Sequence, residues 1–316
     1  MVRAVVTGGA GFIGSHIVDL LLAEGHDIAV VDNLVTGKHS NLNPRARFYE
    51  ASVVSPSLKW VLAAERPEVV FHQAAQMSVK ASTDDPLYDA QINVIGLVNL
   101  LEACVAAGVR KVVYASSGAI YGNPVYLPLD EDHPQRPESP YGITKLAGEH
   151  YLRYYALERG LRYTALRYGN VYGPRQDGYG EAGVVAIFAH QLLTGQVPVI
   201  HWDGEQVRDY VYVADVARAN LLAAATGDGC CYGIATGIGT SVNHLYRLLC
   251  ESIGVDVTPR RGPRRPGDLR VAYFDASRAR ADLGWEPTVG LRDGLRLTVE
   301  ARRRELATAT ARAAAG

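Results

Sequence analysis

Long apolar runs are missing from this sequence of 316 residues, although 48% of its residues are hydrophobic. No run approaches the roughly 20 residues that a membrane-spanning helix needs. The N-terminus begins with a predicted strand at 3–7, not with a basic region followed by an apolar signal segment. We therefore expect a cytoplasmic protein without a membrane partner.

An excess of one charge sign is also missing, because 32 basic residues stand against 33 acidic residues and the formal net charge is -1. A strongly basic surface is typical of proteins that bind nucleic acids or anionic membranes. The balance predicts no nucleic-acid partner. It does not exclude a small anionic ligand that a few local arginines hold.

Cysteine is scarce, and the four cysteines have neither the spacing of a disulfide framework nor that of a zinc site. The adjacent Cys230 and Cys231 would fit redox chemistry, but we interpret them as small residues near the end of a strand. The sequence therefore predicts no metal site.

What the chain does contain is an alternation of β-rich and helical segments. Near-continuous apolar strands separated by helices are typical of a parallel sheet that helices cover on both faces. After residue 173 glycine and proline become frequent and the elements shorten, which indicates a second, smaller lobe. The predicted strands are 4–7, 28–31, 69–72, 111–114 and 163–167, and the predicted helices are 15–24, 97–107 and 141–159.

A glycine-rich segment at 7–14 lies between the first predicted strand and the first predicted helix. Gly8 permits a tight turn, Gly11 lets a pyrophosphate approach the backbone, and Gly14 lets the helix pack close to the strand. The helix N-terminus adds free N–H groups and about half a positive charge. We expect the α/β class, with a Rossmann-type doubly wound parallel sheet and a smaller C-terminal α/β substrate-binding lobe.

An acid follows the second predicted strand, at the position of a ribose-binding carboxylate. Asp32 would repel a 2′-phosphate and the neighbouring Asn33 is neutral, so the pair favours NAD over NADP. Lys38 leaves NADP open. The alternative interpretation is a tight structural turn followed by a chance acid.

Tyr141 and Lys145 are four residues apart and therefore lie on one face of a predicted helix. A phenol with a pKa of about 10 needs a lowering worth about 4 kcal/mol to act as a base near neutrality. One cation at about 4 Å supplies that order of energy at an effective dielectric constant of 20. Lys145 and an oxidised nicotinamide together are sufficient, although the spacing alone also occurs by chance.

Two serines follow the predicted strand that ends near residue 115. Ligands bind at the carboxyl ends of strands in open α/β sheets. A hydroxyl there can hold a substrate alcohol or carbonyl while Tyr141 moves its proton. We expect Ser117 to have this role and Ser116 to cap a turn.

Eight segments together resemble those of a known family. They are T-G-G-A-G-F-I-G-S-H, V-D-N-L, F-H-Q-A-A, S-S-G-A-I-Y-G, Y-G-I-T-K, L-R-Y-G-N-V-Y-G-P-R-Q, V-R-D-Y-V-Y-V-A-D-V and R-R-P-G-D-L. From residue 5 to about 295, the chain resembles the extended short-chain dehydrogenases/reductases of the NAD-dependent epimerase/dehydratase family, and within them bacterial UDP-glucose 4-epimerases.

The resemblance implies that Ser117, Tyr141 and Lys145 are the catalytic hydroxyl, base and lysine. The residues that it implies for NAD are Gly8, Gly11, Phe12, Ile13, Gly14, Asp32, Asn33, Gly37, Ser52, Val53, Gln73, Ala74, Ala75, Asn93, Tyr141, Lys145 and Tyr168. Those implied for the UDP-sugar are Gln76, Ser117, Gly118, Asn170, Arg208, Arg265 and Asp268. Ser52 is a departure, since family members often carry an aspartate there that touches adenine.

The change in composition after residue 173 and the Ala/Thr/Arg-rich end of the chain suggest the domain organisation. We predict an NAD-binding Rossmann domain with the catalytic residues at 1–172 and a nucleotide-sugar-binding lobe mainly at 173–306, with some threading back to the sheet. A disordered tail is predicted at 307–316. A homodimer through helices near 90–107 and 141–159 is implied by the resemblance alone.

Related enzymes share the first oxidation at the sugar C4 and differ in the fate of the 4-keto sugar. A 4,6-dehydratase places Asp-Glu directly after the catalytic hydroxyl, and a UDP-glucuronate decarboxylase has Glu at the second position. Here Gly118 and Ala119 supply no acid or base and would leave space for a sugar to turn. This predicts an isomerase, a 4-epimerase that acts through a transient 4-keto sugar and retains NAD.

The substrate is predicted from the loop at 73–78, which carries no charge. A neutral loop favours UDP-glucose and UDP-galactose. UDP-glucuronate is the alternative, because hydroxyl, amide and backbone N–H groups can hold its carboxylate. UDP-N-acetylglucosamine, a nucleotide-sugar dehydratase reaction and a non-catalytic NAD-binding protein are the remaining alternatives.

Overall fold

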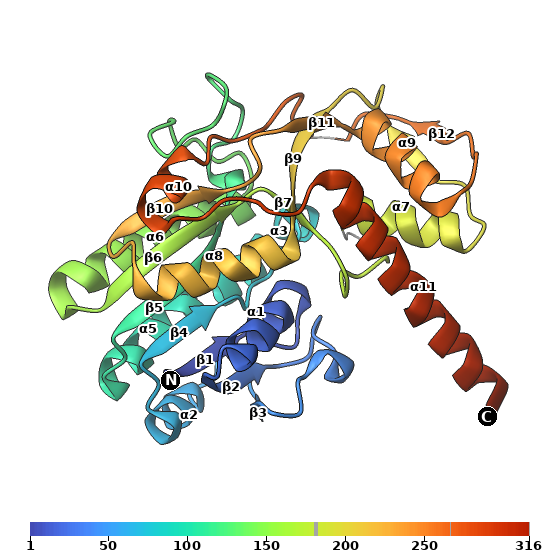
Figure 1. Cartoon of the computed structure of the whole chain (residues 1–316). Coiled ribbons are helices and arrows are strands. Elements are labelled where there is room, and N and C mark those ends of the chain that lie inside the picture. Colours follow the sequence, from blue (N-terminus) through green and yellow to red (C-terminus); the bar gives the residue numbers. More distant parts are fainter. Residues whose placement is uncertain (180–182, 266, 316) are drawn as a thin grey trace.

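The computed structural model describes residues 1–179, 183–265 and 267–315, with residues 309 and 311–315 as backbone only. Its centre is a seven-stranded parallel sheet in the order β10-β6-β5-β4-β1-β2-β3 (Figure 1). The predicted α/β class with a doubly wound sheet is confirmed. The strands are β1 (Arg3–Thr7), β2 (Asp27–Asp32), β3 (Arg47–Glu50), β4 (Val69–His72), β5 (Lys111–Ser117), β6 (Arg162–Tyr168) and β10 (Cys230–Ile234).

The strand order reverses between β1 and β4. From β1 the chain adds β2 and β3 on one side and then β4, β5, β6 and β10 on the other. Crevices at such a switch point, outside the carboxyl ends of the strands, bind ligands in open α/β sheets. Both segments that follow β1 and β4 are predicted to bind the cofactor, so the topology brings them to one place.

Helices cover both faces of the sheet because strand side chains alternate in direction. Val6 and Val30 pack in one apolar cluster with α1, whereas Val5 and Val31 pack in a second cluster with α2 and α5. On the first face lie α1 (Phe12–Ala23), α8 (Val213–Ala225) and α10 (Ser277–Leu283), and on the second lie α2 (Leu58–Glu65), α5 (Gly96–Ala107) and α6 (Pro140–Arg159). Helix α1 starts three residues before its predicted start at Ser15, because the extended Gly11 is its N-cap.

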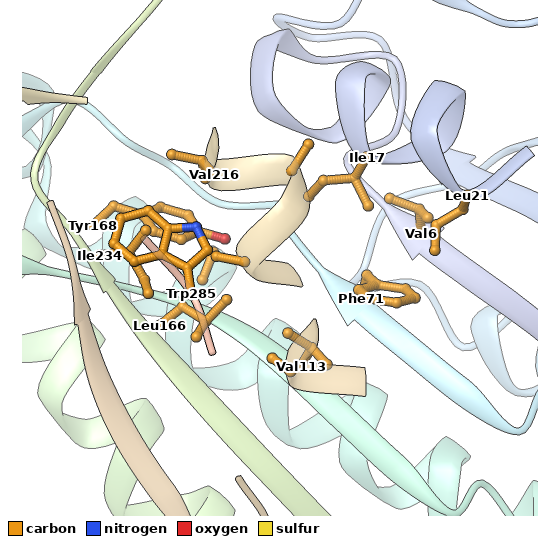
Figure 2. Packing of buried hydrophobic residues seen from close by; sticks show 14 of the residues in the cluster. Val6, Ile17, Leu21, Phe71, Val113, Leu166, Tyr168, Val216, Ile234 and Trp285 are labelled. Carbon is orange, nitrogen blue, oxygen red and sulfur yellow. The ribbon is translucent and has the colours of Figure 1, made fainter. Parts of the chain in front are cut away.

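Figure 2 shows the first cluster from close by. Val6, Phe71, Val113, Leu166 and Ile234 come from five parallel strands and meet side chains of α1 and α8. The fully buried Trp285 lies among them and donates its indole N–H to the carbonyl oxygen of Asp215 at 2.8 Å. Burial of this side chain stabilises the packing of the C-terminal part of the chain against the sheet.

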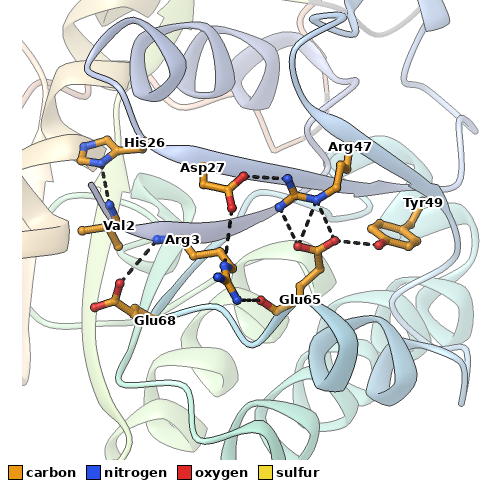
Figure 3. A network of polar contacts seen from close by, with 8 residues as sticks. All are labelled: Val2, Arg3, His26, Asp27, Arg47, Tyr49, Glu65 and Glu68. Carbon is orange, nitrogen blue, oxygen red and sulfur yellow. Dashed lines mark hydrogen bonds and ion pairs between the residues drawn. The ribbon is translucent and has the colours of Figure 1, made fainter.

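The edge strand β3 pairs with β2 on one side only, and a polar network also holds it (Figure 3). Arg47 donates to Glu65 of α2 at 2.7 Å and to Asp27 at 2.6 Å, and Tyr49 donates to Glu65 at 2.6 Å. The bonds from Arg47 and Tyr49 lower the pKa of the Glu65 carboxyl group. A charged edge of this kind also protects the sheet against pairing with another chain.

The smaller lobe has its own apolar core, in which Tyr172, Tyr210 and Tyr212 pack with three helices. Its elements are β7 (Asn170–Tyr172), α7 (Val184–Leu193), β8 (Val199–His201), β9 (Val207–Tyr212), β11 (Gly239–Ser241), α9 (Val242–Ile253), β12 (Arg260–Gly262) and α11 (Leu291–Ala315). Strand β10 leaves this part of the chain and returns to the main sheet. Helix α11 covers much of the predicted tail, Gly316 lies outside the described residues, and the domain boundaries stay predictions.

One long helix runs from Pro86 to Ala107 and joins α4 (Pro86–Ala90), the π-helical η2 (Gln91–Ile95) and α5. By length and mean hydropathy alone this helix could cross a membrane, although charged and amide residues interrupt its apolar sequence. It carries Asp89 and Asn93, both buried and bonded to other elements, which identifies it as a packed layer of this fold. The remaining short elements are η1 (His39–Asn41), α3 (Val79–Asp84) and η3 (Gly118–Ile120).

Trp285 provides a test of the sheet packing. Trp285→Ala should lower the free energy of unfolding by about 3–5 kcal/mol, because it leaves a cavity in the first cluster. The matched control is Trp60→Ala on α2, whose side chain is 68% exposed and whose removal should cost less than about 0.5 kcal/mol. Denaturant unfolding measures both, and equal effects would contradict this packing.

Candidate active site

The glycine turn at 8–14 connects β1 to α1 and touches the loop after β4. Gly8 has φ of +72°, and a Cβ there would lie 2.6 Å from the backbone nitrogen of Ala74. A Cβ on Gly14 would collide with the carbonyl oxygen of Gly8. The turn is therefore as tight as the sequence predicts, and it presents the N-terminus of α1 to an anion. This cradle fits the pyrophosphate of a dinucleotide.

Asp32 closes the same turn from the end of β2. Its carboxylate is buried and accepts from the backbone N–H of Ala10 at 3.0 Å and of Leu34 at 2.8 Å. Each oxygen keeps a second lone pair that a ribose hydroxyl can use. The Nζ atom of Lys38 lies 3.6 Å from the Oδ1 atom of Asp177, so the carboxylate offsets the positive charge that could have attracted the 2′-phosphate of NADP. The site favours a ribose without a 2′-phosphate.

Most residues predicted to touch the cofactor follow the carboxyl ends of parallel strands. Asn33 and Gly37 follow β2, Ser52 and Val53 follow β3, the segment 73–75 follows β4, and Tyr168 ends β6. Parallel strands bring all of them to one edge of the sheet, and their contacts with a cofactor stay predictions. Asn93 differs, because it is buried in η2 and its amide bonds to Gln76 and Thr144.

The three predicted catalytic residues converge at the same edge of the sheet. Ser117 is the last residue of β5, and its hydroxyl is close enough to the phenol of Tyr141, in the first turn of α6, to lower the pKa of that phenol. Ser139 caps α6 by accepting from the N–H of Gly142 at 3.1 Å. A Cβ on Gly142 would lie 2.5 Å from the carbonyl oxygen of Ala119, so this glycine lets α6 start directly against η3.

Lys145 lies one turn further along α6 and is buried. Its Nζ donates to the carbonyl oxygen of Ala115 at 2.8 Å and lies 5.8 Å from the centre of the Tyr141 ring. The Tyr114 ring is 5.1 Å from the same Nζ. The ammonium group is thus held between the end of β5 and the predicted base.

Burial opposes the charged form of both catalytic groups. It raises the pKa of Tyr141, which the neighbouring Ser117 hydroxyl lowers in part. It lowers the pKa of Lys145 to about 8, which the negative charge of Asp89 opposes. The sequence predicts an attraction between the two groups that favours the phenolate form of Tyr141. The structure adds a desolvation cost that opposes this form.

Neighbouring polar residues have structural partners. His72 is buried, lies 2.7 Å from the hydroxyl of Thr7, and has its pKa lowered to about 3 by burial and by Lys145. It is therefore neutral. Ser116 was expected to cap a turn, but it donates to Glu149 at 2.5 Å, because it still lies inside β5 and faces a buried ion pair with Arg167.

The predicted diphosphate residues lie on the smaller lobe. Arg208 of β9 pairs with Asp268, and Arg265 is exposed on the loop between β12 and Asp268. Asn170 begins β7, which pairs with β9 in the small sheet. The structure thus brings Arg208 and Asp268 into contact and places Asn170 on the adjacent strand.

Trp202 is a residue that the sequence analysis missed. It has φ of +60°, a conformation that is strained for a bulky side chain. The guanidinium groups of Arg264 and Arg270 lie 4.5 and 4.8 Å from its ring centre. Arg264 also donates to the carbonyl oxygen of Asp268 at 3.1 Å. Trp202 therefore anchors the loop that carries Arg265, and no sequence spacing signals this.

Two residues predicted to face the sugar have other contacts. A Cβ on Gly118 would collide with the ring of Phe274, so this glycine is required by packing and not only by space for a sugar. The Gln76 amide donates to Asp89 at 2.7 Å and accepts from the N–H of Ser78 at 2.5 Å. These bonds fix Gln76 at the end of β4, where its contact with a sugar stays a prediction.

Burial of the charged Lys145 side chain lowers the free energy of unfolding. A fall in pKa from 10.5 to about 8 corresponds to roughly 3 kcal/mol of destabilisation. Because the folded pKa is lower than the unfolded one, this cost is complete below about pH 8 and disappears as the pH rises to 10.5. We expect Lys145→Met to abolish catalysis and to raise the free energy of unfolding of the cofactor-free protein at pH 7.

Denaturant unfolding at pH 7 and near pH 10 measures this effect, and the gain should shrink at the higher pH. Lys80→Met is the control, since this lysine is exposed on α3. A variant less stable than the wild type at pH 7 would show that Lys145 is held by stronger interactions than the structure contains.

Comparison with known proteins agrees with this geometry. The model of the NAD dependent epimerase/dehydratase family matches residues 4–234. The UDP-glucose 4-epimerase of Mycolicibacterium smegmatis is 47% identical over 305 residues, which cover 94% of this chain and 97% of that protein. A crystal structure of UDP-glucose 4-epimerase from Thermotoga maritima with UDP-glucose has a TM-score of 0.95 and 52% identity, and the match covers 96% of this chain and 99% of that chain.

A second structure, UDP-glucose 4-epimerase from Thermus thermophilus in complex with NAD, has a TM-score of 0.91 and 46% identity. The match covers 95% of this chain and 99% of that chain. Similarity of this extent spans both the sheet and the smaller lobe. The chain belongs to the NAD dependent epimerase/dehydratase family.

Proposed function

We propose that this protein is an NAD-dependent 4-epimerase of a UDP-hexose, with UDP-glucose and UDP-galactose as the favoured pair. The observation that carries the proposal is the convergence of Ser117, Tyr141 and the buried Lys145 at the sheet edge that also holds the glycine turn. The relatives from Mycolicibacterium smegmatis and Thermotoga maritima, both named UDP-glucose 4-epimerase, support the choice of reaction.

Each catalytic side chain has a defined task in this proposal. Ser117 holds the sugar 4-hydroxyl, and the Tyr141 oxygen takes its proton as the 4-keto sugar forms. Lys145 stabilises the phenolate by its charge. When bound, NAD supplies reversible hydride transfer and is restored at the end of each cycle. Tyr141 returns its proton to the oxygen after the sugar has presented its opposite face.

The residues next to Ser117 support epimerisation over elimination. Gly118 and Ala119 have no acid or base to remove a C5 proton or to expel a C6 hydroxyl. Asp32 and the glycine turn would hold the cofactor, and Arg208, Arg265 and Asp268 the UDP group. The NAD-binding part at 1–172 and the sugar-binding lobe mainly at 173–306 remain part of this proposal.

A substrate panel tests the function. Purified protein without added cofactor should interconvert UDP-glucose and UDP-galactose, and UDP-glucuronate and UDP-N-acetylglucosamine complete the panel. Preference for either of these two would replace the favoured pair. A strict requirement for stoichiometric external NAD would contradict a retained cofactor.

Tyr141→Phe should reduce kcat by at least about 100-fold, because general acid–base catalysis typically contributes 10²–10⁴-fold. Tyr154→Phe is the matched control, since this tyrosine lies on the same helix and is exposed. Undiminished turnover in Tyr141→Phe would remove this residue as the base.

We also propose that the protein is a homodimer located in the cytoplasm. Exposed apolar side chains gather on the neighbouring elements α4, η2 and α6, among them Leu87, Ile95, Ile143 and Leu157. A second copy that packs the same helices against them would cover this face and form an isologous interface.

Ile143→Glu combined with Leu157→Glu should convert the dimer to a monomer, because it places two charges in the covered face. Sedimentation velocity measures the change. Ile238→Glu is the control, because Ile238 is an exposed apolar residue far from α6 along the chain. A wild-type protein that sediments as a monomer would refute the dimer.

A further inference from the structure

A buried acid outside the predicted catalytic set lies beneath the first turn of α6. Asp89 of α4 has no exposed surface. Its carboxylate accepts hydrogen bonds from Gln76 at 2.7 Å, from Asn93 at 3.0 Å and from the hydroxyl of Thr144 at 2.8 Å. The protein thus satisfies a charged group that it has removed from water, which is costly unless several donors surround it.

The three donors come from separate segments: the loop after β4, the helix η2, and α6. Thr144 stands between the two catalytic positions of α6, and its hydroxyl is also within 3.0 Å of the carbonyl oxygen of Tyr141. Asp89 therefore connects the predicted sugar-facing loop to the turn that carries the base.

The charge of Asp89 also reaches the catalytic groups. Lys145 has only a carbonyl oxygen as its hydrogen-bond partner among the described residues, and Asp89 is the acid that opposes the burial effect on this lysine. Glu149, on the same helix, is engaged by Arg167 at 2.7 Å.

Three further titratable groups face this corner, His72 from β4, Tyr114 from β5 and Tyr168 from β6. Burial lowers the pKa of His72 to about 3, raises the pKa of Tyr168 to about 12 and raises the pKa of Tyr114 far above its ordinary value. All three groups are therefore neutral in the working pH range. Among the described residues, the charge that acts on Tyr141 and Lys145 from a neighbouring element is that of Asp89.

We propose that Asp89 is a positioning residue of this enzyme, whose carboxylate fastens α6 to the Gln76 loop and whose negative charge keeps Lys145 an ammonium ion in the buried site. This inference rests on the proposed function. The same charge opposes ionisation of Tyr141, so Asp89 sets the pH range over which a deprotonated Tyr141 coexists with a protonated Lys145.

The sign of the effect follows from charge alone. A nearby negative charge favours the ammonium form of Lys145 and disfavours the phenolate form of Tyr141. Removing it should lower both pKa values, and hence move both limbs of the pH profile of kcat to lower pH by about 1 unit. A residue that served packing alone would reduce the rate without moving the limbs.

Two variants separate the charge from the hydrogen bonds. Asp89→Asn keeps the shape of the side chain. Its amide oxygen can accept from Gln76 and Asn93, and its amide N–H can donate to the hydroxyl of Thr144. That hydroxyl can then donate to the backbone carbonyl oxygen of Tyr141. Thr144→Val keeps the charge and loses the bonds of the hydroxyl to Asp89, to Asn93 and to the carbonyl oxygen of Tyr141. Asp89→Asn should shift both limbs, whereas Thr144→Val should lower kcat with both limbs unmoved.

A second readout needs no turnover. Ultraviolet titration in the presence of NAD, taken as the difference between each protein and its Tyr141→Phe counterpart, follows the phenolate of Tyr141 directly. Its midpoint should fall by about 1 pH unit in Asp89→Asn and stay in place in Thr144→Val. Failure of the proposed function would instead appear as a wild type that turns over no UDP-sugar.

A double-mutant cycle covers the case in which Asp89→Asn is too unstable for the kinetic measurements. In a Lys145→Met background the substitution should lower the denaturant midpoint less than it does in the wild type, because no buried ammonium ion is left uncompensated. Equal losses in both backgrounds would overturn the proposal, as would limbs that do not move in a folded Asp89→Asn or that move equally in Thr144→Val.

Discussion

The burial of an ammonium ion at the end of β5 is the constraint on which the active site depends. Lys145 has one hydrogen-bond acceptor in the described structure, the carbonyl oxygen of Ala115, and is otherwise enclosed by the rings of Tyr114 and Tyr141. A charge in such a place is tolerated only when opposite charge and fixed dipoles surround it. The arrangement of β5, α4 and α6 supplies both.

The parallel sheet determines where these groups meet. Every strand of the main sheet runs in the same direction, so the segments that follow β1, β2, β4 and β5 emerge at one edge. The glycine turn, Asp32, the Gln76 loop and Ser117 therefore gather at the strand-order reversal, although they are spread over more than 100 residues of the chain. A cofactor and a sugar that bind at this edge would therefore contact the same set of loops.

Two buried carboxylates on this side of the sheet have different functions. Glu149 bonds to Ser116 and to the guanidinium group of Arg167, so its charge is balanced within the core that joins β5, β6 and α6. Among the described residues, the donors in direct contact with Asp89 are all neutral, namely Gln76, Asn93 and Thr144. Its charge remains available to the catalytic corner, since neutral donors stabilise a carboxylate without cancelling its field.

Short-range patterns in the sequence were sufficient for much of the main sheet. Apolar runs and the glycine turn predicted five of its seven strands, β1, β2, β4, β5 and β6, and the doubly wound order, but neither β3 nor β10. The pairing of Tyr141 with Lys145 on one helix face follows from helix geometry, which needs no knowledge of the fold. Only the tertiary structure shows the partners of Asp89 and Ser116. The same holds for the Phe274 ring beside Gly118 and for the two guanidinium groups over the Trp202 ring. These contacts join residues distant in sequence, and burial, which sets the sign of each pKa change, exists only after the chain has folded.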